Sequence, residues 1–254
     1  MQALDAFNCR LTALDLGLFF GISGQSDAGD RRAWLAVQRS IRRAGYVYLE
    51  TGSYLGGSIQ QHLLDPLCTR IISIDSRRSL ALDDRGETIQ YPENSTENML
   101  ANLRRIDATS LGKLVTFDVD ASEIDPLDIP AAPHFCFIDG EHTRAAVLSD
   151  FEFCLRVCDP DAAICFHDAR IVDSALREIL SILNHRKIPV SALRLGGDTF
   201  GIFLRNCPVV DDHFIRENSS DGMRFLRRMH LRKIVKAAFP RWMHRGFRAA
   251  FPAP

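Results

Sequence analysis

The chain lacks any apolar run that approaches the ~20 residues needed to cross a bilayer. Its N-terminus also lacks the basic region and apolar core of a secretory signal. The seven cysteines are odd in number, and no second cysteine or histidine pair at zinc spacing accompanies Cys154 and Cys158. We therefore expect a cytoplasmic protein without a zinc centre, in which Cys136 and Cys165 act as small buried hydrophobic residues.

Acidic residues are missing from 222–254, a tail that holds nine Lys and Arg residues. The remaining residues include 22 basic and 32 acidic side chains, so the main part of the chain has a net charge of −10. Large apolar residues such as Trp242 and Phe247 interleave with the basic ones, and Pro240 interrupts any single long helix. We expect the tail to pack within the chain or in a homo-oligomer, before contact with a peripheral membrane surface and last with nucleic acid.

Strands and helices are expected to alternate from residue 46 to residue 205, which predicts a three-layer α/β sheet. The predicted strands cover 46–49, 70–74, 112–119, 135–138 and 162–166, with a closing pair around a glycine turn in 193–205. The predicted helices cover 31–44, 59–67, 95–106, 143–158 and 171–183, and the polar loop 76–92 is long enough to suggest a function.

A glycine-rich turn follows the first strand. Glu50, Gly52, Gly56 and Ser58 stand in the pattern E-x-G-x-x-x-G-x-S, which differs from the dinucleotide-binding G-x-G-x-x-G. A strand, a glycine turn and a helix together place backbone N–H groups where a polar or anionic ligand binds. The alternative is a structural glycine turn in another α/β protein.

Polar residues follow each of the other predicted parallel strands, and these residues are Asp75, Asp120, Asp139 and Asp168. Ligands of open α/β sheets bind outside the carboxyl ends of the strands, so all four are candidate site residues beside Gly52. Asp75 lies near the distance at which an acid of a nucleotide fold reaches the ribose. The alternatives are a strand-ending turn residue for Asp75 and a turn or N-cap residue for Asp120.

The run Ile-Asp-Gly-x-His at 138–142, followed by a helix and Phe-His-Asp at 166–168, completes a resemblance. Residues 46 to about 205 resemble class I S-adenosylmethionine-dependent methyltransferases of the methyltransferase family 24 type. The resemblance implies a Rossmann-like, mostly parallel sheet with an antiparallel C-terminal strand. It also implies O-methylation of a hydroxyl on a sugar, glycoconjugate or natural product. We divide the chain into an N-terminal helical or lid segment (1–45), the methyltransferase domain (46–210) and a basic amphipathic tail (211–254).

The resemblance assigns roles to the residues after the strands. The cofactor-binding set that it implies is Glu50, Gly52, Ser53, Gly56, Ser58, Asp75 and Asp120. Within it, Asp75 would accept hydrogen bonds from the ribose hydroxyls, and Asp120 lies where such enzymes contact the adenine.

Metal-dependent relatives bind Mg²⁺ through three positions that correspond to Asp139, Asp168 and Ala169. Both acids suit Mg²⁺, but a methyl side chain cannot coordinate. The third ligand is then His142, His167, Glu141 or water, and Mg²⁺ dependence stays open.

The acceptor oxygen also needs activation, by a metal or by a general base. His142, His167 and Asp139 are the candidate catalytic residues, with His142 preferred over His167. Structural roles are the alternative for the two histidines. Ala169 also keeps open a non-catalytic binding module on the same fold, whereas the glycine spacing disfavours a nicotinamide-dependent oxidoreductase.

Overall fold

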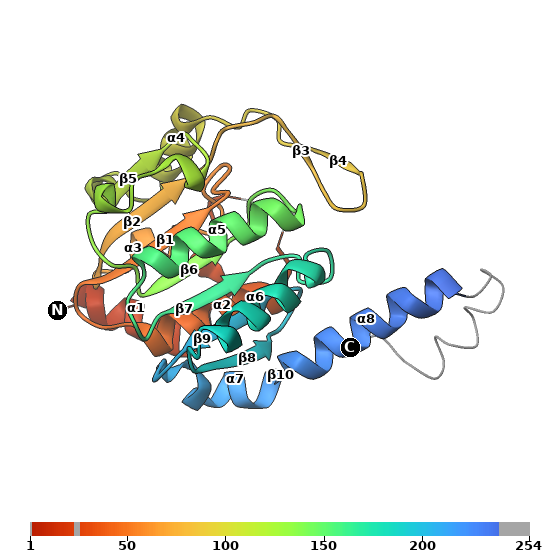
Figure 1. The fold of residues 1–254 in the computed structure, drawn as a ribbon. Helices are drawn as coiled ribbons and strands as arrows, with labels where there is room; N and C mark the ends of the chain where they lie inside the picture. Colours follow the sequence, from red (N-terminus) through yellow and green to blue (C-terminus); the bar gives the residue numbers. More distant parts are fainter. Residues whose placement is uncertain (1, 23–25, 239–254) are drawn as a thin grey trace.

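The computed structural model describes residues 2–22 and 26–238. Its central sheet has the strand order β10-β8-β9-β7-β6-β1-β2-β5 (Figure 1). The strands of this sheet are β1 (Tyr46–Thr51), β2 (Cys68–Ile74), β5 (Leu114–Phe117), β6 (Phe135–Ile138), β7 (Ala163–Phe166), β8 (Val190–Arg194), β9 (Phe200–Leu204) and β10 (Ser220–Asp221). Strands β7, β6, β1, β2 and β5 are parallel, and β9 runs antiparallel between β7 and β8. The predicted mostly parallel sheet with an antiparallel C-terminal end is confirmed.

The helices are α1 (Gln2–Thr12), α2 (Ala28–Ile41), α3 (Gln60–Leu64), α4 (Thr96–Asp107), α5 (Arg144–Val157), α6 (Asp173–His185), α7 (His213–Asn218) and α8 (Gly222–Ala238). A separate hairpin of β3 (Leu80–Leu82) and β4 (Thr88–Gln90) lies in the loop after β2. No helix of the described ranges is both long and apolar enough to cross a membrane.

The core has two layers because successive side chains of a strand point to opposite faces of the sheet. Tyr48 of β1 packs with the buried residues of α2 and α3, whereas its neighbour Leu49 packs with those of α5 and α6. Each central strand is buried on both faces, as expected of parallel strands covered by helices. The sheet and its two helical layers make the predicted three-layer architecture (Figure 1).

Several predicted boundaries are wrong, and local hydrogen bonding explains them. Gly112 lies in a 3-10 helix, Thr109–Lys113, so the strand begins only where Leu114 pairs with β2. The helix predicted over 59–67 is shorter in the structure and spans only Gln60–Leu64. It ends at Asp65, whose carboxylate accepts a hydrogen bond from the N–H of Leu67. Helix α2 begins earlier than predicted, since Asp27 caps it in a capping box.

Candidate active site

The glycine turn after β1 lies against the end of β6. Gly52 has a φ of +82°, and a Cβ at this position would lie 2.2 Å from the backbone oxygen of Asp139. Its N–H donates to the carbonyl oxygen of Ile74 at the end of β2. Only glycine suits this conformation and this approach, which bring the ends of three parallel strands together.

Glu50 lies beneath the turn rather than on its surface. Its carboxylate is fully buried and accepts hydrogen bonds from the hydroxyls of Ser58 and Tyr48. Burial raises the pKa of Glu50 to about 8, although both hydroxyls oppose the shift. Glu50 therefore orients the hydroxyl of Ser58 from the buried side of the turn. Ser58 itself lines the smaller of the two cavities described below.

Two adjoining cavities lie at the carboxyl ends of the parallel strands. The larger, of about 310 Å³, is lined by residues that include Gly52, Asp75, Asp120 and Asp139. The smaller, of about 50 Å³, is lined by Gly52, Asp139 and also Ser53, Ser58, Trp34 and His167. The structure thus brings most of the predicted site residues to one place. Glu50, Gly56, His142 and Asp168 line neither cavity.

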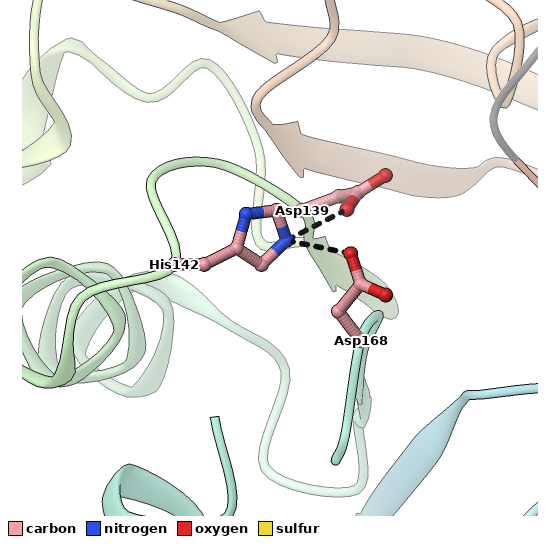
Figure 2. Close-up of side chains that lie close together, drawn as sticks. All are labelled: Asp139, His142 and Asp168. Carbon is pink, nitrogen blue, oxygen red and sulfur yellow. Dashed lines mark ion pairs between the residues drawn. The ribbon is translucent and has the colours of Figure 1, made fainter. Parts of the chain in front are cut away.

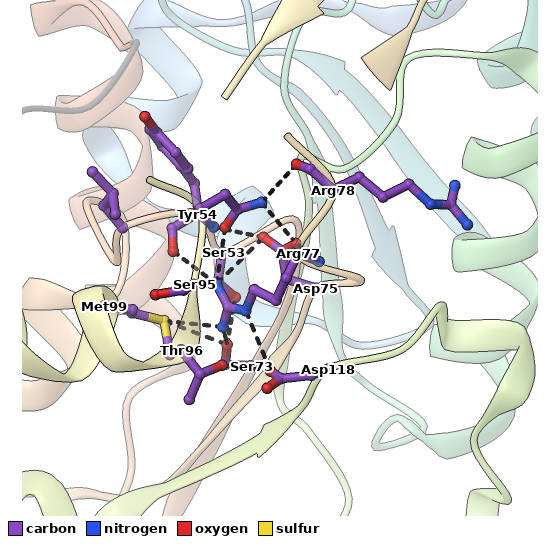
Figure 3. A network of polar contacts seen from close by, with 12 residues as sticks. Ser53, Tyr54, Ser73, Asp75, Arg77, Arg78, Ser95, Thr96, Met99 and Asp118 are labelled. Atoms are coloured by element: carbon purple, nitrogen blue, oxygen red, sulfur yellow. Dashed lines mark hydrogen bonds and ion pairs between the residues drawn. The ribbon is translucent and has the colours of Figure 1, made fainter. Parts of the chain in front are cut away.

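Asp75 is held in place by the backbone of the two loops beside it (Figure 3). Its Oδ2 accepts from the N–H of Tyr54 at 2.8 Å, and its Oδ1 accepts from the N–H of Arg77 at 2.8 Å. The side-chain amide of Asn94 donates to Oδ1 at 3.2 Å. Tyr54 has a φ of 45°, which is uncommon for a bulky residue and marks a constrained turn. Asp75 therefore has a fixed orientation at the cavity wall.

Asp120 has the N-cap position that was one of the roles expected of it. It is the N-cap residue of the 3-10 helix Ala121–Glu123, and it also lines the larger cavity. Arg78 joins it at 2.5 Å and reaches Glu141 at 3.5 Å, so an arginine connects the loops after β5 and β6.

A cluster of two acids and a histidine follows β6 and β7 (Figure 2). Nε2 of His142 lies 3.0 Å from Oδ2 of Asp168 and 3.7 Å from Oδ1 of Asp139. The contact at 3.0 Å lacks the direction of a hydrogen bond, and neither buried ring nitrogen has a hydrogen-bond partner among the described residues. Asp168 has a φ of 50°, a strained conformation often found at functional sites.

These groups have the spacing of metal ligands. One ligand atom from each of Asp139, His142 and Asp168 lies within 4.8 Å of the others. Two atoms bound at right angles to one ion, at about 2.1 Å each, lie about 3.0 Å apart. The unpartnered imidazole nitrogen and the two carboxylates therefore fit a divalent cation. Ala169 is fully buried in the core and takes no part.

His167 lies between two carboxylates. Its Nδ1 is 3.2 Å from Oδ1 of Asp139, and its Nε2 is 3.5 Å from Oδ2 of Asp30. Burial lowers the pKa of both histidines, but the neighbouring carboxylates outweigh it and raise the pKa of His142 to about 9 and that of His167 to about 11. Burial opposes the shift at Asp139 too, yet the histidines lower its pKa to about 2. Without a cation, both imidazoles are charged at neutral pH, which does not suit a general base.

The sequence analysis missed Asp30 and Asp150. Asp30 of α2 accepts hydrogen bonds from the N–H of Asp198 and the hydroxyl of Thr199, contacts that span 168 and 169 residues and leave no local signal. Asp150 lines the larger cavity, and burial raises its pKa to about 7. An acid between the inward-facing Val147 and Phe151 of α5 was a signal that could have been noticed.

The β3–β4 hairpin is attached to the loop that carries His142. Asp83 forms a parallel bridge with His142, and the N–H of Asp84 donates to the His142 carbonyl oxygen. The Asp84 carboxylate accepts from the N–H of Arg144 at 2.9 Å and from the hydroxyl of Ser174 at 3.2 Å. Tyr91, just after the hairpin, lines both cavities. The long loop after β2 thus forms part of the site.

Comparison with known proteins identifies the family of the central segment and the fold of the chain. Residues 49–169 match the family described as a methyltransferase domain, and this segment is a class I S-adenosylmethionine-dependent methyltransferase domain. No curated protein sequence matches the chain. The structure of CalS11, a calicheamicin methyltransferase, is similar with a TM-score of 0.51 at 16% identity, covering 80% of this chain and 91% of its own. An O-methyltransferase of Bacillus cereus in complex with SAH has a TM-score of 0.50 at 13% identity, with 80% and 90% covered. These two likenesses show the shared fold.

Proposed function

We propose that the protein transfers the methyl group of S-adenosylmethionine to a hydroxyl oxygen of a small-molecule acceptor, such as a sugar, glycoconjugate or natural product. The observation that carries the proposal is that Gly52 and Asp139 line both cavities, so the cofactor motifs around Gly52 and Asp75 share a wall with the acid after β6. An O-methyltransferase and a calicheamicin methyltransferase with the same fold support this acceptor class.

The larger cavity would hold the adenosine part of the cofactor. Asp75 presents a fixed carboxylate for the ribose hydroxyls, and Asp120 lies beside the position of the adenine. Ser53 and Ser58 of the smaller cavity would face the methionine part, with Gly52 and Gly56 shaping the turn. In this arrangement the sulfonium methyl group lies near Asp139, because that residue lines both cavities.

Asp139, His142 and Asp168 would hold a divalent cation. A cation bound there lowers the pKa of an acceptor hydroxyl and orients it for in-line transfer. The chain's own contribution is to fix the ligands: His167 contacts Asp139, and the strained backbone of Asp168 directs its carboxylate to the same point. The ring nitrogens of His142 have no hydrogen-bond partner among the described residues, and one of them lies beside both carboxylates, which supports a ligand role over the general-base role that the sequence suggested.

Residues 1–45 would form a wall of the methyl-transfer cavity rather than a separate domain. Trp34 of α2 lines the smaller cavity, and its indole N–H donates to Thr199 at 2.9 Å. Trp34 also packs edge-on against His167, with ring centroids 5.7 Å apart. This segment is therefore part of the acceptor side of the site in our proposal.

Calorimetric titration of the purified protein with S-adenosylmethionine and with NAD tests the cofactor. The first should bind and the second should not. Asp75→Ala should weaken binding roughly 10- to 100-fold, since charge-assisted hydrogen bonds are lost. Asp118→Ala is the matched control, because Asp118 also contacts Arg77 but does not line the cavity. Binding without methyl transfer to any hydroxyl acceptor would favour the non-catalytic module instead.

A further inference from the structure

Helix α8 is anchored to the body along one side, by contacts that extend from Phe225 to Lys233. Phe225 and Leu226 are buried, and the Phe225 ring lies 5.1 Å from the guanidinium of Arg194. Lys233 adds an ion pair with the buried Asp173 of α6. Beyond these contacts the helix projects away from the body, on the side towards which β7 points (Figure 1).

The face of α8 turned from the body carries an apolar stripe. Met223, Leu231 and Ile234 are 45%, 55% and 49% exposed, and they are large apolar side chains on one helix. At 3.6 residues per turn they fall within an arc of roughly 80°, with Arg227 among them. We call this set the α8 stripe.

Cationic residues border the α8 stripe. Arg224 and Arg228 lie along one side of it and, with Arg227, are exposed. No carboxylate among the described residues pairs with any of these three arginines. Within residues 2–22 and 26–238, the apolar stripe is therefore exposed and these three arginines lack a carboxylate partner, although the residues before 222 have a net charge of −10.

We propose that the α8 stripe docks on the surface of an anionic phospholipid bilayer. An amphipathic helix with apolar residues beside arginines lies in the interface, where the apolar side chains enter the headgroup region and the cations contact acidic lipids. The sequence after α8 continues the same composition, with Trp242 and Phe247 among arginines and no acid. Tryptophan suits this interface because it has an apolar ring and a polar N–H.

A second copy of the chain explains the stripe less well. Two copies packed stripe to stripe would bring the arginines of both helices together, and α8 has no Asp or Glu to pair with them, so like-charge repulsion disfavours this contact. Nucleic acid would contact the arginines but leave the three exposed apolar side chains without a role. The lipid surface accounts for both kinds of side chain.

Sedimentation with vesicles tests this surface in the full chain. Binding should be strong to phosphatidylcholine vesicles that contain phosphatidylserine and weak to phosphatidylcholine alone. The double variant Leu231→Ser/Ile234→Ser should lower the bound-to-free ratio at least 10-fold, since two side chains lose their apolar contact. Arg227→Glu/Arg228→Glu should lower it by roughly 25-fold or more, because each cation near the surface contributes about fivefold.

Leu127→Ser is the matched control, because Leu127 is also exposed but lies far along the chain from α8. It should leave vesicle binding unchanged, and all variants should bind S-adenosylmethionine like the parent. Equal binding to both kinds of vesicle, or no loss in either α8 variant, would overturn the proposal. A change of oligomeric state in the Leu231→Ser/Ile234→Ser variant, measured by light scattering and without loss of vesicle binding, would assign the stripe to a second copy.

Discussion

Gly52 and Asp139 are in direct backbone contact, although 87 positions separate them in the sequence. A Cβ on Gly52 would meet the Asp139 backbone oxygen at 2.2 Å, far inside any real contact distance. One residue belongs to the cofactor turn and the other to the proposed metal site. The cofactor turn and the proposed metal site are thus in contact at these two residues. This contact requires glycine at position 52, because any side chain there would clash with Asp139.

Gly52→Ala should disrupt the site. The substitution combines a positive φ with a backbone clash, and each strained position costs about 1–3 kcal/mol. We expect a lower melting temperature and loss of S-adenosylmethionine binding by calorimetry. Gly86→Ala separates the two causes, because Gly86 has a φ of +77° but no atom within 4 Å of its Cβ position. If both variants bound the cofactor normally, the contact would not matter.

Metal binding should depend on Asp168 and His142. Asp168→Asn and His142→Gln should each weaken Mn²⁺ binding, followed by electron paramagnetic resonance, by roughly 10-fold or more. We expect Mn²⁺ to bind more tightly than Mg²⁺, because an imidazole ligand suits transition metals better. His213→Gln, a change at an exposed histidine, is the control. Unchanged Mn²⁺ affinity in both site variants would show that these residues do not bind the cation.

The buried Glu50 should make stability fall as pH rises. Its pKa is raised from 4.5 to about 8, so between these values the folded state holds a proton that the unfolded state has released. The free energy of unfolding should therefore decrease towards pH 8, by at most about 1.4 kcal/mol per pH unit from this group. Glu50→Gln should remove this slope in melting curves without cofactor, whereas Glu97→Gln at an exposed site should keep it. Parallel curves for parent and Glu50→Gln would contradict the argument.

Asp84→Ala should release the β3–β4 hairpin. The variant loses the hydrogen bonds that tie the hairpin to Arg144 and Ser174, at a cost of about 1 kcal/mol. We expect faster amide hydrogen exchange in residues 80–90 and weaker S-adenosylmethionine binding, because Ala81 and Tyr91 line the larger cavity. Asp125→Ala removes a comparable surface cap at Leu127 and should change neither measurement.

The sheet and the gathering of acids at its edge were predictable from the sequence. Strand-forming runs that end in Asp75, Asp139 and Asp168 carry their own signal, and parallel strands bring their carboxyl ends to one edge. The helix that follows β6 was predicted within one residue at each end, because Thr143 is a clear cap. Strands, helix ends and the acids that follow strands depend on local sequence pattern, and they can therefore be predicted from the sequence.

The finer roles depend on contacts that only the folded chain makes. Asp30 lies in the first turn of α2, where it completes the capping box of Asp27, but its contact with His167 comes from packing across the whole domain. The third group of the acid cluster was left open between several residues, and three-dimensional proximity favours His142. Glu50 was expected at the cofactor, yet its burial beneath Ser58 depends on neighbours in space.

The position of β9 has a consequence for how the protein is made. The loop after β7 is held from the far end of the chain, since the N–H of Ala169 donates to the carbonyl oxygen of Asp198. Strand β9 pairs with β7. The hydrogen bond from the Thr199 hydroxyl to Asp30 joins residues that are 169 positions apart, so it can form only after Thr199 has been synthesised. The contacts that hold the loop after β7 are therefore completed only once residues 198 and 199 have been made.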